Sequence, residues 1–148
     1  REVTQAIASA DLICMAGFLS LWRIPDEFYG KVINIHPALL PEFGGAGMYG
    51  RRVHEGVLAS GATVSGATIH YVDEEYDHGP IIAQWPVPVR AGDTQKSLAA
   101  RVLEAEHRLL SAVVTELARL GVPQQPVRLF AAGSAYIAGE GVAIGFGK

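Results

Sequence analysis

Short, continuous apolar runs recur along this chain of 148 residues, separated by polar or glycine-rich stretches. The runs "LICMAG" and "KVINI" predict two strands that are buried on both faces of a sheet. The segments "TVSGATIHYV" and "IIAQWPVPV" predict two more strands, and the prolines of the last segment restrict it to a sheet edge or a bulge.

Helical spacing is clearest between Thr94 and Leu120. Asp93 or Thr94 can cap the start of this helix, and Gly121 can end it. Apolar side chains recur there three or four positions apart, at Leu98, Val102, Ala105, Leu109, Val113, Leu117 and Leu120. This spacing predicts one long amphipathic helix with an apolar stripe that faces the core.

Shorter helices are expected over residues 1–10, after Pro25, and from Arg51 to Ser60, where Gly61 would end the last of them. The alternation of strands and helices predicts an α/β domain with a mainly parallel central sheet. A chain of this length is expected to form one domain with a real core.

Composition narrows the class of protein. Apolar residues make up 49% of the chain and charged residues 18%, which is typical of a folded globular protein. The net charge is −3 and Arg51-Arg52 is the sole basic doublet, so a nucleic-acid surface is not expected. Cys14 is the single cysteine, which excludes a disulfide framework and fits the reducing cytoplasm. No apolar run reaches the ~18 residues that a membrane span needs.

Asn34 and His36 stand two positions apart at the end of the predicted strand "KVINI". Residues two apart on a strand share one face, and ligand crevices form at the carboxyl ends of strands in open α/β sheets. The pair offers an amide donor and a titratable imidazole. Geometry alone leaves a structural role equally open, in which each side chain bonds a neighbouring loop.

The loop "DEEYDHGPI" follows another predicted strand. Its acidic residues Asp73, Glu74 and Glu75 are expected to be solvated. Asp77 differs because Gly79 and Pro80 follow closely and would shape a fixed turn around it. A carboxylate held there could orient a histidine and accept a proton.

The remaining histidines are expected to be structural or exposed. His70 lies within a predicted strand, while His54 and His107 lie on predicted helices and would face solvent or a neighbouring charge. The five histidines show no spacing that is typical of metal ligands, so no metal site is expected.

Four segments, taken together, resemble the phosphoribosylglycinamide formyltransferase family, the folate-dependent enzymes of purine synthesis. They are "NIHPALLP", "GMYGRRVHEGVLASG", "SGATIHYVDEEYDHGPIIAQ" and "VPVRAGDTQKSLAARVLEAEH", in the same order and with similar spacing from about Asp11 to Leu120. The resemblance implies a three-layer, Rossmann-like formyltransferase fold. It would place the catalytic domain at residues 1–122 and an extension of edge strands or loose tail at residues 123–148.

The resemblance also implies transfer of a formyl group from the co-substrate 10-formyltetrahydrofolate to the amine of glycinamide ribonucleotide. Asn34, His36 and Asp77 fall on the catalytic trio of the family. Attack of an amine on a formamide carbon develops an oxyanion, which Asn34 and a protonated His36 could stabilise. Asp77 would keep His36 charged and assist proton transfer.

Two further sets of residues carry binding roles by resemblance. The folate would contact backbone groups in "MAGFLSLW" and a loop that closes over the pteridine, namely Leu19, Ser20, Leu21, Trp22, Val72, Asp73 and Asp77. The ribonucleotide would contact Met48, Tyr49, Gly50 and Glu106.

Members of this family carry an additional N-terminal part whose glycine-rich loop holds the substrate phosphate. This part has no counterpart before Arg1, so the fold is expected to be N-terminally truncated. Two alternatives therefore stay open: a formyltetrahydrofolate deformylase, which usually has a second histidine where this chain has Pro37, and a folate-binding fragment without activity. A methionyl-tRNA formyltransferase is less expected, because it would need a more basic surface than this chain has. We expect small-molecule substrates, no nucleic acid or membrane partner, and a cytoplasmic location; a homodimer is left open.

Overall fold

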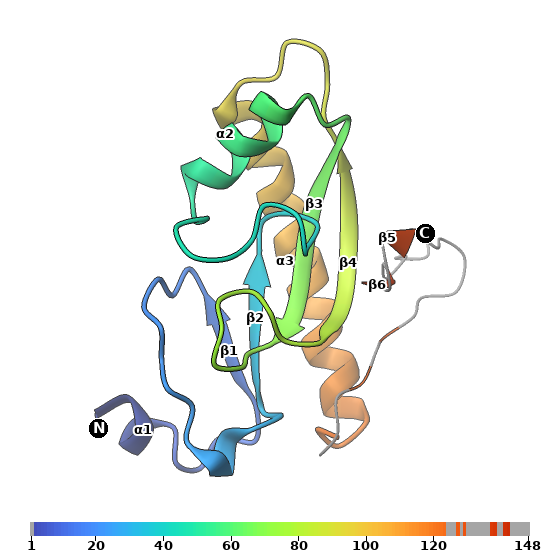
Figure 1. Cartoon of the computed structure of the whole chain (residues 1–148). Helices are drawn as coiled ribbons and strands as arrows, with labels where there is room; N and C mark the ends of the chain where they lie inside the picture. Colours follow the sequence, from blue (N-terminus) through green and yellow to red (C-terminus); the bar gives the residue numbers. More distant parts are fainter. Residues whose placement is uncertain (1, 124–126, 128, 130–136, 139–140, 143–148) are drawn as a thin grey trace.

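The computed structural model describes residues 2–123 and, beyond them, residues 127, 129, 137–138 and 141–142. One sheet contains, in spatial order, β1 (Ile13–Ala16), β2 (Val32–His36), β3 (Val64–Tyr71) and β4 (Ile81–Pro88) (Figure 1). The helices are α1 (Glu2–Ala6), the 3-10 turn η1 (Asp26–Phe28), α2 (Arg51–Ser60) and α3 (Gln95–Arg119). Every strand and helix predicted within residues 2–123 is present, close to its predicted position.

The sheet is mixed, so the prediction of a mainly parallel sheet is wrong for the described residues. β1 and β2 pair in parallel, whereas β2–β3 and β3–β4 pair antiparallel. The loop of residues 72–80 explains the last pairing, because a parallel neighbour would need a crossover of a dozen or more residues. Hydrophobic pattern alone does not carry this information, since buried strands look alike in either direction.

β1 also differs from its prediction as a strand buried on both faces. Cys14 and Ala16 are exposed, while Ile13 and Met15 are partly buried. Within the described part of the chain β1 pairs with β2 alone, so it forms one edge of the sheet.

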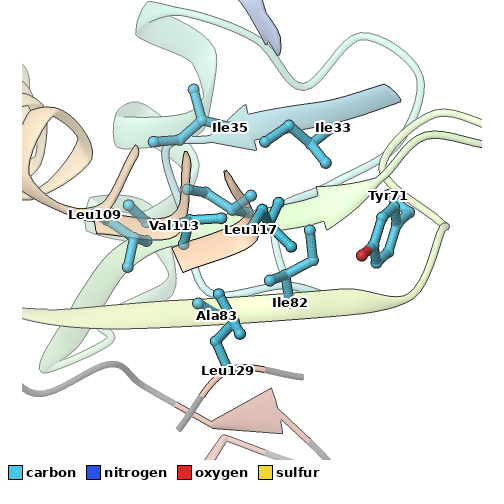
Figure 2. Packing of buried hydrophobic residues seen from close by; sticks show 11 residues of the cluster. Ile33, Ile35, Tyr71, Ile82, Ala83, Leu109, Val113, Leu117 and Leu129 are labelled. Atoms are coloured by element: carbon cyan, nitrogen blue, oxygen red, sulfur yellow. The ribbon is translucent and has the colours of Figure 1, made fainter. Parts of the chain in front are cut away.

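One face of the sheet is apolar and packs against α3, which runs along it (Figure 1). Figure 2 shows Leu109, Val113 and Leu117 of α3 packed among strand residues such as Ile33 and Ile82. The predicted stripe is buried from Leu98 to Leu117, but Leu120 follows the last turn and is exposed. Of the two predicted caps, Thr94 is the one that caps α3, in a reciprocal capping box with Ser97. None of the described helices combines the length and apolar composition needed to cross a membrane.

The opposite face of the sheet carries buried polar side chains. Strand register places Asn34 opposite His70, His36 opposite Thr68, and Thr68 opposite Gln84. Because side chains alternate along a strand, all of these lie on the face away from α3. Within the described residues, loop segments cover this face.

Thr68 and Gln84 fix the chain that follows His36. The Thr68 hydroxyl donates to the Ala38 carbonyl (2.7 Å) and accepts from the Leu40 amide (3.0 Å). The Gln84 side-chain amide donates to the Leu40 carbonyl (2.9 Å) and to the Thr68 hydroxyl (3.0 Å). Since buried polar groups are costly without partners, this network holds residues 38–40 against β3 and β4.

Most of the predicted extension at 123–148 lies outside the described residues. Within the described part, β5 (Ile137–Ala138) and β6 (Gly141–Val142) form a short antiparallel pair. The Leu129 amide donates to the Ile82 carbonyl (3.0 Å), and the Leu129 side chain is buried in the core beside β4.

A substitution on β3 tests the close packing beneath the polar face. A Cβ at Gly66 would overlap the carbonyl of Trp85 and the side chain of Leu39. We therefore expect Gly66→Ala to lower the free energy of unfolding by about 1–3 kcal/mol, measured by urea denaturation.

Gly56→Ala on α2 is the matched control. Its nearest neighbours would be Met48 Cε at 3.3 Å and Phe43 Cδ1 at 3.5 Å, both on side chains that can adjust. Alanine also favours helix by about 0.5–1 kcal/mol over glycine, so stability should be unchanged or slightly higher. Equal losses in the two variants would contradict the packing of β3 described above.

Candidate active site

A cavity of about 770 Å³ opens where the parallel strands β1 and β2 end. Its wall includes Asn34, His36, His54, His70 and Asp77. Asn34 and His36 share one face of β2, as their spacing predicted, and that face is the polar one. A crevice at the carboxyl ends of strands is the usual position of a ligand site in an open α/β sheet.

Asp77 joins two loops at this cavity. Its backbone has a φ of 54°, which is uncommon for a residue other than glycine. Its Oδ2 atom accepts a hydrogen bond from the Gly45 amide (3.0 Å) and lies 3.4 Å from His36 Nδ1. Its Oδ1 atom lies 3.5 Å from His70 Nε2. The carboxylate therefore stands between two buried imidazoles.

Two opposing effects act on the pKa of His36. Asp77 and the Phe43 carbonyl raise it, in the direction expected for a carboxylate neighbour, while burial lowers it by more. The net shift favours the neutral ring. His36 Nε2 lies 2.8 Å from the Phe43 carbonyl, which can only accept, so Nε2 carries the proton. Nδ1, the basic atom of the neutral ring, faces Asp77.

Asp77 is held in its charged form. Burial raises the pKa of its carboxyl group, but the contact with His70, the attraction to His36 in its protonated form and the Gly45 amide together lower it further than burial raises it. A neutral imidazole next to an ionised carboxylate can take up a proton, because the cation that forms is then paired. The arrangement suits a reaction in which a proton must be accepted and returned.

His70 is a site residue that the sequence alone assigned to structure. Its Nδ1 atom donates to the Tyr71 carbonyl (2.8 Å), so Nε2 is left to accept from the Asn34 side-chain amide (3.3 Å). This contact orients Asn34 at the cavity. Periodicity could not reveal it, because the pair meets only through the antiparallel register of β2 and β3.

Of the two predicted positions for His54, facing solvent or facing a neighbouring charge, the first is wrong. Only 5% of the residue is exposed, and it lines the same cavity from α2. Burial lowers the pKa of His54, and His36 lowers it further when protonated. Its Nδ1 atom has no hydrogen-bond partner among the described residues. His107, by contrast, is exposed on α3 at the cavity mouth.

Most residues with predicted binding roles do line this cavity, on three of its walls. The predicted folate-side residues found there are Leu19, Ser20, Leu21, Trp22, Val72 and Asp77, and the predicted ribonucleotide-side residues are Met48, Tyr49, Gly50 and Glu106. Asp73 is not among the lining residues; its carboxylate instead bonds the Glu75 amide and His78. The structure thus brings these side chains together, while their binding roles stay predictions.

Glu106 contributes a buried carboxyl group from α3. Burial raises the pKa of the Glu106 carboxyl to about 7. The cavity wall therefore contains, besides the cluster around Asp77, an acid that changes charge near neutral pH. In residues 2–123, no three His, Cys, Asp or Glu side chains converge as a metal ion would require.

Comparison with known proteins gives a consistent set of relatives. The formyl transferase family profile matches residues 1–114. A chloroplastic phosphoribosylglycinamide formyltransferase of Vigna unguiculata is 55% identical over 111 residues, which is 72% of this chain and 35% of that protein. A phosphoribosylglycinamide formyltransferase of Mycobacterium tuberculosis is 44% identical over 127 residues, or 81% of this chain and 55% of that protein. The chain thus spans about a third to a half of these relatives.

Solved structures agree with this result. The phosphoribosylglycinamide formyltransferase of Anaplasma phagocytophilum matches with a TM-score of 0.71 and 39% identity, over 80% of this chain and 57% of that one. The enzyme of Streptococcus pneumoniae matches with a TM-score of 0.69 and 38% identity, over 79% of this chain and 64% of that one. The formyltransferase fold predicted from the sequence is confirmed.

Glu106 gives a pH-dependent prediction for stability. Its pKa is about 7 in the folded protein against an ordinary value of 4.5. Between these values the unfolded chain releases a proton that the folded protein retains, so stability is lost as the pH rises through 7. Glu106→Gln should match the wild type at pH 4.5 and exceed it by roughly 3 kcal/mol at pH 8, in urea unfolding at each pH.

Glu104→Gln is the control, because Glu104 is an exposed neighbour on the same helix. It should change stability little at either pH. If Glu106→Gln gave the same difference at pH 4.5 and pH 8, the burial of a neutral Glu106 would be refuted.

Proposed function

This chain belongs to the formyl transferase family, and we propose that it transfers a formyl group from 10-formyltetrahydrofolate to the amine of glycinamide ribonucleotide in purine biosynthesis. The observation that carries the proposal is the cluster of Asn34, His36 and Asp77 at the end of β2, beside an apolar-walled cavity large enough for two small substrates. Relatives named phosphoribosylglycinamide formyltransferase support the choice of acceptor.

The proposed reaction replaces one C–N bond by another. The amine of the ribonucleotide attacks the formyl carbon, and a tetrahedral intermediate with an oxyanion forms. The bond from that carbon to the folate nitrogen then breaks. The attacking amine loses one proton and the leaving nitrogen gains one, so the site must accept a proton and return it.

Asn34 is proposed to stabilise the oxyanion. One N–H of its amide is directed to His70 Nε2, which fixes the plane of the group. The other N–H is then available to the developing oxyanion. A donor that is already oriented needs no reorganisation as charge develops, and one such donor is typically worth about 10²–10³ in rate.

His36 and Asp77 are proposed to carry the proton. Nδ1 of His36 is its basic atom, because Nε2–H is committed to the Phe43 carbonyl. When Nδ1 takes the amine proton, the imidazolium lies 3.4 Å from the Asp77 carboxylate. The positive charge is therefore stabilised when it forms, and it in turn favours the oxyanion. Burial destabilises the charge beforehand, so the ring is free to act as a base.

The cavity walls suggest where each substrate lies. We place the folate ring against residues 19–22 and Val72, where apolar side chains and backbone groups meet. We place the ribonucleotide toward Glu106 on α3 and the glycine-rich loop at residues 48–50. We keep small molecules as the partners, leave a homodimer open, and assign the reaction to a reducing compartment such as the cytoplasm, since Cys14 has no second cysteine to pair with.

Alanine substitutions test the proton-transfer pair. His36→Ala and Asp77→Ala should each lower kcat/KM for formyl transfer by about 10²–10⁴, because each removes a group that carries the proton or its charge. The measurement is the steady-state rate of folate product formation with both substrates present. Near-wild-type turnover in either variant would overturn the assignment, provided that circular dichroism shows both variants folded.

Binding experiments separate the enzyme from an inactive folate-binding protein. Isothermal titration of the chain with a formyl-folate analogue, and separately with glycinamide ribonucleotide, should give a 1:1 complex in each case. Binding of the folate without the ribonucleotide would contradict the proposed acceptor, and it would favour the inactive alternative. Release of formate with water as acceptor would instead favour a deformylase.

A further inference from the structure

Asp77 adopts a strained backbone conformation that contacts from surrounding residues must hold in place. Its φ of 54° lies in the left-handed region, which costs energy for a residue with a Cβ atom. Such conformations persist only where several independent contacts of the surrounding structure enforce them. The orientation of its carboxylate, which reaches the Gly45 amide and both imidazoles, depends on this backbone geometry.

One constraint lies on the carboxyl-terminal side of the loop. A Cβ at Gly79 would overlap the carbonyl of Tyr71, so the chain passes directly against the end of β3 there. The Tyr71 amide also donates a hydrogen bond to the Pro80 carbonyl (2.9 Å), which holds the chain in this position. These contacts fix the loop at residues 79–80 but leave the peptide between Asp77 and His78 to be oriented by something else.

A second constraint closes the loop across Asp77. Asp73 Oδ1 accepts from the Glu75 amide (2.8 Å), and Asp73 Oδ2 accepts from His78 Nδ1 (2.8 Å). The Asp73 carboxylate thus connects Asp73 to His78, the residue that immediately follows Asp77. Because His78 adjoins Asp77, holding its ring also holds the intervening peptide.

We propose that Asp73 and His78 form a positioning pair that keeps Asp77 in its left-handed conformation, with its carboxylate directed at Gly45, His36 and His70. Neither residue touches the cavity cluster; the pair acts through the backbone of Asp77. Its kinetic consequence rests on the function proposed above, whereas its structural consequence does not.

Exposure limits how large the effect can be. The side chains of His78 and Asp73 are 65% and 31% exposed, and exposed ion pairs contribute little to global stability. The pair should therefore affect local geometry more than unfolding. The hydrogen bond to Asp73 and the charges of Asp73 and Glu75 raise the pKa of His78, which strengthens the contact near neutral pH.

Hydrogen exchange at a single amide tests the proposal. The Gly45 amide is protected only while Asp77 Oδ2 accepts its proton, so its exchange rate reports the position of Asp77. In His78→Ala this rate should rise about three- to fivefold, a size typical of a lost contact between exposed groups. Asparagine can place an amide N–H near the position of Nδ1, so His78→Asn should stay within about twofold of the wild type.

A matched control removes an exposed ion pair of the same kind far along α3. Glu116→Ala breaks the contact of Glu116 with Arg119 (2.6 Å) and should leave Gly45 exchange unchanged. The proposal is overturned if the Gly45 amide is unprotected in the wild type, if His78→Ala leaves its exchange unchanged, or if His78→Asn loses protection to the same extent as His78→Ala.

Kinetics provide a second, separable readout. If the proposed function holds, His78→Ala should lower kcat about three- to tenfold with little change in KM for the folate, and His78→Asn should restore most of it. A chain without any formyl transfer would refute the proposed function and leave the Gly45 result to decide the positioning pair. A loss confined to KM would refute the positioning role.

Discussion

Asn34 meets His70 because β2 and β3 pair antiparallel in one particular register, and His70 in turn lies beside Asp77. A shift of this register by one residue would turn the polar side chains of one strand toward α3, where the apolar core leaves no partner for them. The apolar face and the site are therefore specified together. Packing of α3 against Ile33 and Ile35 on one side fixes Asn34 and His36 on the other.

Burial then decides the electrostatics of this polar face. The same loss of water that lowers the pKa of His36 also makes each of its contacts with charge stronger. The pKa of Asp77 is lowered because its contact with His70, its attraction to a protonated His36 and the Gly45 amide outweigh the effect of burial. A neutral ring and a charged carboxylate in contact form a pair that is ready to accept a proton, which is the requirement of an amine attacking a formyl group.

The loops around the cavity are held both by their own residues and by residues that are distant in the sequence. Residues 38–40 are held by side chains of β3 and β4, and the loop at 73–78 is closed by a carboxylate and an imidazole of its own. The glycine-rich loop joins them through the bond from Gly45 to Asp77. The geometry of the cavity therefore depends on three segments that are distant in the chain. The sequence of the loop "DEEYDHGPI" alone does not contain these contacts.

The sequence by itself determined the elements and the phase of their side chains, because periodicity and capping are local. The helix α3, a cap at Asp93 or Thr94, and the common face of Asn34 and His36 all follow from the sequence. Motif resemblance supplied the family. Only the tertiary structure decided the direction of strand pairing, the exposure of β1, the burial of His54, and the recruitment of His70. It also set the burial that lowers the pKa of His36. These properties depend on which segments contact each other and on how much water those contacts exclude. The local sequence of one segment predicts neither.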